Sequence, residues 1–361
     1  MKIAVPLART SISGGTRIAL QYAEELAKCG HAVVLLFPKD TRFDFFSLPA
    51  NVITIPLDVP RRIRRLLGGI ADILSIARSI PVCDVILCNS WQMVFPALLS
   101  HATRRGSRIV HLIQHLDSVI IAEKPWLVRW QNIFLSTLVY RLPIQKIVVS
   151  SWLKEAVWRI AKQPATCVPN GVNTAAFIVN TAPHWEPARE TIDILVTGRL
   201  ARWKGYNDVV EAVRLLASSN PRIRLVVASR ENVPLPSDYP CVLVRPSNDK
   251  ELGTLYQKCS VFVMASWCEG FGLPALEAMA LGAPVVTTDC CGINDFARHG
   301  INCLVVPPRQ PAELAQAIET ILRDPILSLR LSKAGQETGR VFTTRRMAEG
   351  LLTALKAPHD Y

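Results

Sequence analysis

The sequence has no apolar run long enough to cross a membrane, since a spanning helix needs about 18 apolar residues and no run reaches that length. Its first residues, MKIAVPLARTS, have too short an apolar core for a signal peptide. We therefore expect a cytosolic protein that does not span a membrane.

Metal-binding and nucleophile motifs are also missing. The ten cysteines include no C-x-x-C pair, and several lie in strand-like runs, which favours reduced, buried thiols. The histidines show no metal-ligand spacing, and no D-x-D motif occurs. There is no G-x-S-x-G elbow and no cysteine with an evident base. We expect no metal, no other cofactor and no protein nucleophile.

The charge is distributed unevenly. Of the net charge of +12, residues 1–165 carry +11, from 21 Lys and Arg against 10 Asp and Glu. The densest basic segment is RRIRR, which holds Arg61, Arg62, Arg64 and Arg65. Such a segment suits the phosphates of an anionic membrane surface, and we expect such a surface, at the inner face of a membrane, rather than nucleic acid as partner. A merely solvated basic face is the alternative.

Short apolar runs alternate with amphipathic stretches along the 361 residues, which predicts parallel sheets covered by helices. The pattern stops in a proline-rich segment over 163–191, which we interpret as a linker, and then restarts. We predict an α/β fold of two doubly wound domains, with boundaries 1–165 and 166–345. The last residues, 346–361, are expected to form a helix that packs back on the first domain.

The segment CEGFGLPALEAMALGAPVVTTD, residues 268–289, combines glycines with two acids. Pro274 suits a first helical turn, so Glu269 lies in the preceding loop and Glu277 about one turn into the helix. Gly270 and Gly272 let a ligand approach backbone amides at a helix N-terminus, which favours an anion or a hydroxyl-rich group. A carboxylate there accepts hydrogen bonds from vicinal hydroxyls. A plain capping loop explains Glu277 but not Glu269.

Two cations, Arg199 and Lys204 in VTGRLARWKG, follow another expected strand and suit a diphosphate. Gly14 and Gly15 in SISGGTR lie between the first strand and the first helix, where backbone amides meet phosphates. This segment matches neither G-x-G-x-x-G nor the P-loop, so a plain turn is the alternative.

His115 ends the expected strand SRIVHLIQH, at the sheet edge where ligands bind in open α/β sheets. A structural role fits His115 equally well. His111 lies in mid-strand and is expected to be a core residue.

With these motifs in this order, the sequence resembles the retaining glycosyltransferases of family 4, which have the GT-B fold of two Rossmann-like domains facing a central cleft. The most specific matches are GRLARWKG, ELGTLYQKCSVFVMAS, EGFGLPALEAMALGAPVV and HGINCLVVPP, which fall between residues 192 and 308. SGGT, VVSSWLKEAV and VPNGVN are weaker matches in the first part of the chain.

The resemblance implies that a sugar moves, with retention, from a nucleotide-diphosphate sugar to a saccharide or lipid-linked acceptor in surface polysaccharide or glycolipid synthesis. It implies that Arg199 and Lys204 hold the donor diphosphate and that Glu277 binds the ribose. The donor sugar is then bound by Glu269 and by the backbone of Gly270, Phe271, Gly272 and Leu273.

From the other domain, the resemblance implies that Gly14 and Gly15 approach the phosphate and that His115 lies near the transferred sugar. Several positions depart from the family. Leu116 separates a His and an Asp that are often adjacent, Asn173 replaces an aspartate, and Asp295 stands where a glutamate is common. Cys303 stands where a glycine is usual. These departures concern the base and sugar contacts.

Two other classes remain open. A nucleotide-sugar epimerase of the same architecture shares a diphosphate site but not this glutamate spacing, and a non-catalytic nucleotide-sugar binder releases no nucleoside diphosphate. A nicotinamide-dependent oxidoreductase is disfavoured because its glycine fingerprint is missing.

Overall fold

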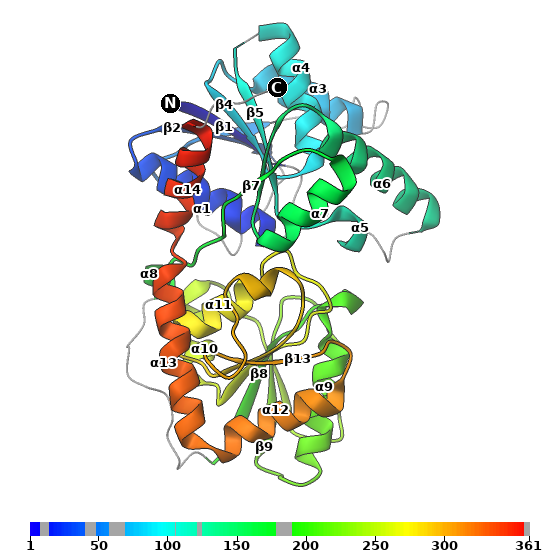
Figure 1. Cartoon of the computed structure of the whole chain (residues 1–361), viewed down its shortest axis with the longest axis vertical. Coiled ribbons are helices and arrows are strands. Elements are labelled where there is room, and N and C mark those ends of the chain that lie inside the picture. The colour runs from blue at the N-terminus through cyan, green and yellow to red at the C-terminus, as the bar shows by residue number, and fades with distance from the viewer. Residues whose placement is uncertain are drawn as a thin grey trace. The chain divides into compact units, whose positions relative to one another are not determined.

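The computed structural model describes residues 1–7, 14–39, 48–57, 69–104, 106–120, 125–177 and 190–356. The chain forms two compact units (Figure 1): unit 1 comprises Met1–Asn170 with Thr344–Tyr361, and unit 2 comprises Gly171–Thr343. The basic segment at 61–65, for which a membrane contact is predicted, lies outside the described residues.

Unit 1 contains a parallel sheet of seven strands in the order β3-β2-β1-β4-β5-β6-β7. Its strands are apolar along most of their length, because helices cover both faces of such a sheet. They are β1 (Lys2–Pro6), β2 (Ala32–Pro38), β3 (Ile53–Leu57), β4 (Val85–Cys88), β5 (Arg108–Ile113), β6 (Gln145–Val148) and β7 (Thr166–Cys167).

The helices described in unit 1 are α1 (Gly14–Lys28), α3 (Gly69–Ser79), α4 (Trp91–Arg104), α5 (Asp117–Ile120), α6 (Trp126–Arg141), α7 (Ser151–Ala161) and α14 (Thr344–Lys356). The chain turns sharply after α1 at Gly30, whose φ of +83° few other residues adopt. Ser150 caps α7 by accepting a hydrogen bond from the Leu153 amide at 3.2 Å.

Helix α14 comes from the far end of the sequence and packs beside α1 (Figure 1). Its buried residues include Met347 and Leu351. The Gln145 side chain, at the start of β6, donates a 2.8 Å hydrogen bond to the carbonyl of Ala354. Unit 1 is therefore completed by residues that follow unit 2 in the chain.

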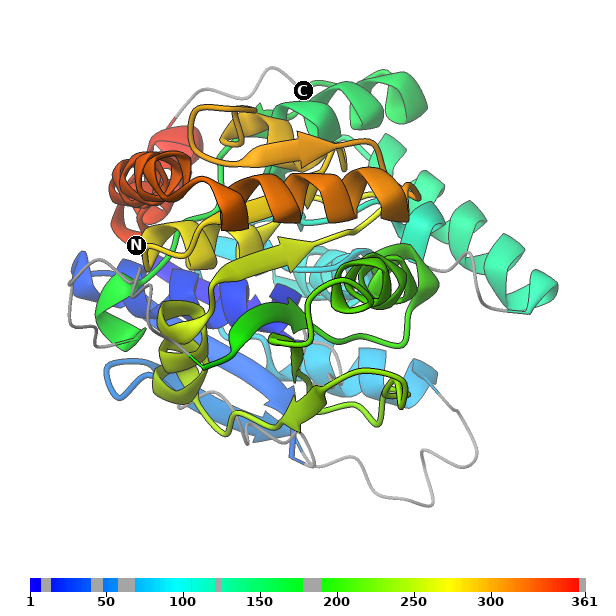
Figure 2. The same cartoon turned by 90° about the horizontal axis from the view of Figure 1, so that it is seen from below.

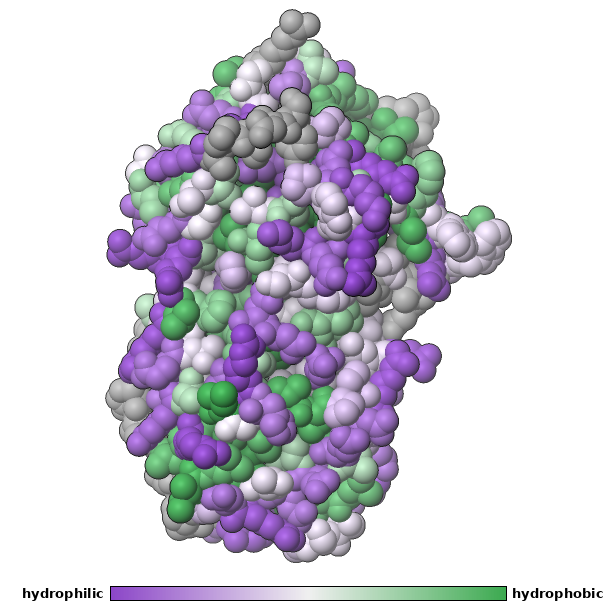
Figure 3. Space-filling view, in the orientation of Figure 1, coloured by the Kyte–Doolittle hydropathy of each residue, from purple (hydrophilic) through white to green (hydrophobic). Residues whose placement is uncertain are grey.

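Helix α6 extends away from the rest of unit 1 in both Figure 1 and Figure 2, where it is drawn in teal. Its other end packs against α5, α4 and α7. In the space-filling view of Figure 3 the projecting end is mostly pale and green, the colours of intermediate and hydrophobic residues.

Unit 2 contains a second parallel sheet, of six strands in the order β10-β9-β8-β11-β12-β13. They are β8 (Ile192–Thr197), β9 (Ile223–Ala228), β10 (Cys241–Val244), β11 (Val261–Met264), β12 (Val285–Thr288) and β13 (Leu304–Val306). The helical segments are α8 (Thr174–Phe177), η1 (Arg202–Lys204), α9 (Tyr206–Ala217), α10 (Asp249–Lys258), α11 (Leu273–Ala280), η2 (Gly292–Asp295), α12 (Pro311–Arg323) and α13 (Pro325–Val341). The predicted pair of doubly wound α/β domains is confirmed.

The linker predicted over 163–191 contains the boundary between the two units, which falls after Asn170, but its described residues also contribute a strand and buried side chains. Thr166 and Cys167 form edge strand β7, and Val172 and Phe177 are buried at 2% and 1% exposure. Phe177 packs closely on α10: a Cβ added to Gly253 of that helix would lie 2.9 Å from the Cβ of Phe177. These apolar residues follow no strand or helix period, so the pattern did not reveal them.

Candidate functional site

The strand order of unit 2 brings two of the predicted loops together. Strands β8 and β11 are neighbours in the sheet, with Val196 paired to Val263. From β8 the next strands, β9 and β10, are added toward one edge of the sheet, whereas from β11 the next strands, β12 and β13, are added toward the other edge. The segment after β8 leads to Lys204, and the loop after β11 leads to Glu269. Ligands of doubly wound sheets bind at this switch point, beyond the carboxyl ends of the strands.

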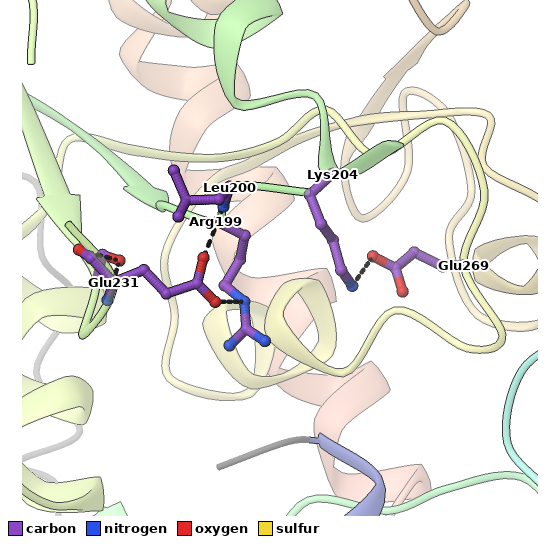
Figure 4. Close-up of polar contacts among 6 residues, drawn as sticks. Arg199, Leu200, Lys204, Glu231 and Glu269 are labelled. Carbon is purple, nitrogen blue, oxygen red and sulfur yellow. Dashed lines mark hydrogen bonds and ion pairs between the residues drawn. The ribbon is translucent and has the colours of Figure 1, made fainter. Parts of the chain in front are cut away.

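Lys204 and Glu269 form an ion pair at this point (Figure 4), with 2.7 Å between Lys204 Nζ and Glu269 Oε1. The Ser266 hydroxyl donates to the same oxygen at 2.7 Å. Glu269 is only 6% exposed, so its charge requires such partners. The Lys204 ammonium also lies 4.2 Å from the centre of the Trp203 ring.

Arg199 occupies a separate position on the same loop (Figure 4). Its Nε lies 3.0 Å from Oε1 of Glu231, which follows β9. The other oxygen of Glu231 accepts a 2.7 Å hydrogen bond from the amide of Leu200. Glu231 therefore fixes both the side chain of Arg199 and the backbone next to it. The two predicted diphosphate-binding cations thus have different acidic partners.

Gly205 explains how the two loops come so close. It has a φ of +65°, and a Cβ built on it would lie 1.9 Å from the carbonyl oxygen of Ala265. The Trp267 amide donates to the carbonyl of Trp203 at 2.7 Å and ties the loops together. Only glycine permits this approach of one backbone to another.

The segment after β12 supports the Glu269 loop from the other side. The Glu269 amide donates to the carbonyl of Cys290 at 2.8 Å, and the Gly292 amide donates to the carbonyl of Glu269 at 3.0 Å. Hydrogen bonding between the thiols of Cys268 and Cys291 lowers the pKa of Cys291 and raises that of Cys268. Burial raises the pKa of Cys290.

Helix α11 carries the second predicted carboxylate. The helix follows Gly272, whose φ is +94°, and has Pro274 in its first turn, where a missing amide hydrogen costs nothing. Glu277 is 4% exposed, and its Oε2 accepts a 3.2 Å hydrogen bond from the Tyr256 hydroxyl of α10. The Tyr256 contact holds this carboxylate on the inner side of α11.

Phe271, a predicted donor-binding residue, has its side chain in the core. It is 3% exposed, and its ring lies 5.2 Å from that of Phe296 and 6.0 Å from that of Phe342. The backbone of the loop over Gly270–Leu273 is therefore what this segment can offer to a ligand.

The candidate residues of unit 1 lie just after the carboxyl end of β5 and at the start of α1. Gly14 and Gly15 are the first residues of α1, and Gln114 donates from Nε2 to the carbonyl of Gly15 at 3.2 Å. His115 follows Gln114, and its Nδ1 lies 3.1 Å from the carbonyl oxygen of Leu116. The structure thus places Gly15 and the Gln114–His115 pair next to each other within unit 1.

Two titratable groups, Asp117 and His111, lie close to His115 in the chain. The Asp117 carboxylate accepts a hydrogen bond from the Tyr140 hydroxyl, and burial raises the pKa of Asp117 to about 6. The Tyr140 ring stacks on His111, with 5.7 Å between ring centres. His111 is 2% exposed and burial lowers its pKa to about 3, which confirms the prediction of a core histidine.

Several residues of the site were missed in the sequence. Glu231, Ser266 and Gln114 all come within a few residues after a strand, so the rule that locates ligand sites at strand ends could have found them. Tyr256 lies within a helix and gave no signal.

In the part of the chain that the structure describes, His, Cys, Asp and Glu side chains form no group of three or more suited to a metal ion. No described helix is long and apolar enough to cross a membrane. All ten cysteines are free thiols, as predicted, and half of them are buried.

Two family models match the chain: glycosyltransferase family 4 over residues 12–176, and glycosyl transferases group 1 over residues 191–324. The chain belongs to the family 4, group 1 glycosyltransferases. An uncharacterized glycosyltransferase of Methanocaldococcus jannaschii is 30% identical over 268 residues, which cover 67% of this chain and 66% of that relative. The chain thus spans slightly less than two thirds of this glycosyltransferase.

Solved structures show the glycosyltransferase fold. Sucrose-phosphate synthase from Thermosynechococcus elongatus superposes with a TM-score of 0.81 at 20% identity, over 98% of each chain. HepE from Anabaena, solved with UDP and glucose, gives 0.78 at 15% identity, over 99% of this chain and 100% of that one. At these identities the likeness establishes the GT-B fold of this family 4 glycosyltransferase.

Proposed function

We propose that the protein transfers a sugar from a nucleotide-diphosphate sugar to a saccharide or lipid-linked saccharide acceptor. The observation that carries the proposal is the ion pair between Lys204 and buried Glu269 at the switch point of the second sheet. Family membership and the UDP and glucose of the HepE complex support the same donor class.

The proposed donor site uses the residues of unit 2 in a fixed order. Arg199 and Lys204 meet the diphosphate, and Glu277 accepts hydrogen bonds from the ribose hydroxyls. Glu269 and the amides over Gly270–Leu273 meet the sugar. The buried position of both glutamates supports these roles, because water competes little for a buried carboxylate.

In the proposed reaction, the bond between the anomeric carbon and the β-phosphate oxygen breaks, and the acceptor oxygen bonds to that carbon. The acceptor proton passes to the departing diphosphate, on the same face of the sugar, so the configuration is retained. Negative charge grows on the diphosphate as it leaves, and Arg199 and Lys204 stabilise it in the transition state. From unit 1, we propose that the Gly14–Gly15 amides approach the phosphate and that His115 lies near the transferred sugar.

We further propose that this transfer needs no divalent metal, because the two cations supply the charge that a metal ion supplies elsewhere. The test compares initial rates in EDTA, in Mg²⁺ and in Mn²⁺. Equal rates are expected. Activity that disappears in EDTA and returns with either metal would contradict the proposal.

The donor assignment is tested first by thermal shift with a panel of nucleotide-sugars, because selective stabilisation follows affinity. The stabilising donor is then incubated with acceptors, and release of nucleoside diphosphate is measured together with the glycosylated product. We expect release only with an acceptor. A converted nucleotide-sugar without acceptor indicates an epimerase, and binding without any release indicates a non-catalytic binder.

Two variants test the residues. We expect Lys204→Ala and Glu277→Gln to reduce transfer by more than tenfold, since loss of a charge-assisted contact in a closed site costs on the order of 2–5 kcal/mol. Lys250→Ala and Glu313→Gln, which change exposed residues of the same unit, are the matched controls. Folding of all four variants is verified by circular dichroism. A folded variant at Lys204 or Glu277 with more than a tenth of the wild-type rate would exclude its assignment.

A further inference from the structure

Helix α6 exposes its apolar side to solvent. Five large side chains, Trp126, Leu127, Trp130, Phe134 and Leu138, are 68%, 64%, 65%, 70% and 47% exposed. Their spacing places them on one face of the helix. The residues that α6 buries are Ser136, Val139 and Tyr140. The apolar surface of α6 therefore exceeds what its packing in unit 1 requires.

The projecting part of α6 is its first half. Every residue from Trp126 to Gln131 is exposed, so none of the described elements of unit 1 covers this first part of the helix. A contiguous apolar patch of this kind on a folded protein indicates an interaction surface. The patch is convex, because it lies on a helix that extends outward (Figures 1 and 2).

The charges around this face have one dominant sign. Helix α6 contains Arg129 and Arg141 and no acidic residue. Across residues 126–161, which include the neighbouring helix α7, there are four basic residues besides Lys146, whose side chain is buried, and one acidic residue, Glu155. That acid pairs with Arg159 on α7. The partner of this surface should therefore be anionic.

We propose that α6 binds an anionic lipid bilayer, with its five exposed apolar side chains between the headgroups and the upper acyl chains and its arginines among the headgroups. Tryptophan and phenylalanine on a helix with basic residues are typical of helices that lie in the interface. A bilayer adapts to a convex helix, and anionic headgroups attract the arginines. A second copy fits less well, because each copy would bring the same positive charge to the contact.

This inference goes beyond the proposed transfer and does not depend on it. It assigns a membrane contact to α6 rather than to the basic segment at 61–65. It also gives a physical basis for an acceptor held at a lipid surface, since unit 1 would then lie against that surface.

The test is sedimentation with sucrose-loaded vesicles of phosphatidylglycerol and phosphatidylcholine, at low salt and without donor. We expect the wild-type protein to sediment with these vesicles and much less with vesicles of phosphatidylcholine alone. The variant Trp130→Ser/Phe134→Ser should lose ~tenfold or more in partitioning, because two large apolar side chains no longer enter the bilayer. Ile301→Ser/Ile326→Ser, which removes exposed apolar side chains from unit 2, should bind like wild type.

A second readout measures insertion directly. Lipids brominated in the acyl chain should quench the tryptophan fluorescence of the wild type. The variant Trp126→Phe/Trp130→Phe should keep binding but lose most of this quenching, because the aromatic surface stays and the fluorophores are removed. Since all these side chains are exposed, the variants should fold, which near-UV circular dichroism verifies.

Three results would overturn the inference. One is a wild type that stays in the supernatant with anionic vesicles. Another is an α6 variant that sediments like wild type while a variant with Arg61, Arg62, Arg64 and Arg65 changed to Ser does not. The third is a wild-type dimer that the α6 variant disrupts, with no vesicle binding. Transfer to a soluble acceptor, measured separately, reports on the proposed function alone.

Discussion

The two buried glutamates of unit 2 depend on different partners. Glu269 is neutralised by Lys204 and also accepts from Ser266, whereas Glu277 accepts from the neutral hydroxyl of Tyr256. A buried charge that loses a cation partner is costly, while a buried pair replaced together by uncharged side chains costs little. Lys204 and Glu269 should therefore behave as one unit in folding as well as in binding.

We predict strong coupling between these two side chains in a double-mutant cycle. Lys204→Met and Glu269→Gln should each destabilise unit 2, and the double variant should be more stable than the sum of the two predicts, by about 1–3 kcal/mol. Urea unfolding followed by circular dichroism measures the three differences. Strict additivity would show that the 2.7 Å pair does not persist in solution.

The thiols beside Glu269 should differ in reactivity. Because the thiolate is the nucleophile, the lowered pKa of Cys291 favours its alkylation, and the raised pKa values of Cys268 and Cys290 slow theirs. With iodoacetamide near neutral pH, peptide mass spectrometry should detect Cys291 modified first of the three. In Cys268→Ala, which removes the hydrogen bond, Cys291 should react more slowly. Earlier modification of Cys268 or Cys290 would contradict this.

Asp117 should make the stability of unit 1 depend on pH. Its folded-state pKa of about 6 lies above the unfolded value, so its protonated form favours folding, and that contribution is lost as the pH rises to about 6. Asp117→Asn should therefore stabilise the protein above this range, by up to about 3 kcal/mol, and change little at about pH 4. Thermal melts at both pH values measure the difference. Equal effects at both would refute it.

Local sequence motifs predicted which side chains belong to the site, but not where every one of those side chains points. Glu269 and Lys204 were predicted from local motifs at strand ends, and topology then brought them into contact. Phe271 was predicted as part of the loop, but the side chains that bury it, Phe296 and Phe342, are distant in sequence. Local motifs locate a loop, whereas the direction of each side chain depends on packing partners that only the fold supplies.

Among the strands and loops, the close contact of η1 with the loop after β11 depends on one glycine. Gly205 and Gly300 both have positive φ, of +65° and +71°. A Cβ at Gly205 would lie 1.9 Å from the Ala265 oxygen, whereas one at Gly300 would meet nothing within 4 Å. An alanine at Gly300 therefore introduces backbone strain alone, whereas an alanine at Gly205 introduces the same strain and also forces the two loops apart. The difference between the two substitutions measures the cost of moving the loops apart.

We predict that Gly205→Ala destabilises unit 2 much more than Gly300→Ala. Gly300→Ala should cost about 1 kcal/mol, the strain of a left-handed alanine. Gly205→Ala adds a backbone clash and should cost at least about 3 kcal/mol, with loss of activity as Lys204 moves. Guanidinium unfolding of the two variants decides the matter. Costs of similar size would mean that the loops separate without penalty.

The order of strands and helices was predictable where the pattern is regular. Alternating apolar runs and amphipathic stretches predicted both sheets, because each parallel strand needs a covering helix. The region around Val172 and Phe177 was predicted as a linker because its apolar residues are isolated. Their burial depends on contacts with distant elements such as α10, which no local period encodes.

For the molecule as a whole, the two units differ in how the chain builds them. Unit 2 is continuous, from Gly171 to Thr343, whereas unit 1 needs both Met1–Asn170 and Thr344–Tyr361. Helix α14 buries Met347, Leu351 and Leu355 within unit 1. Each such side chain contributes about 1.5–3 kcal/mol when fully buried.

We predict that a fragment of residues 171–343 folds alone, while a fragment of residues 1–170 is severely destabilised. Addition of a peptide of residues 344–361 should raise the melting temperature of the second fragment, because it restores the cover of α1. Circular dichroism melts measure this, and removal of 357–361 alone serves as a control with little expected effect. A fragment 1–170 that melts at the same temperature with and without the peptide would contradict the prediction.

The return of the chain to unit 1 also fixes an order of events on the ribosome. Synthesis runs from the N-terminus, so the long first part of unit 1 emerges early but must wait for α14. Unit 2, although it begins later, is fully synthesised first. During that interval the surface of α1 that α14 later covers is exposed, which makes the nascent chain a client for chaperones until α14 has been synthesised.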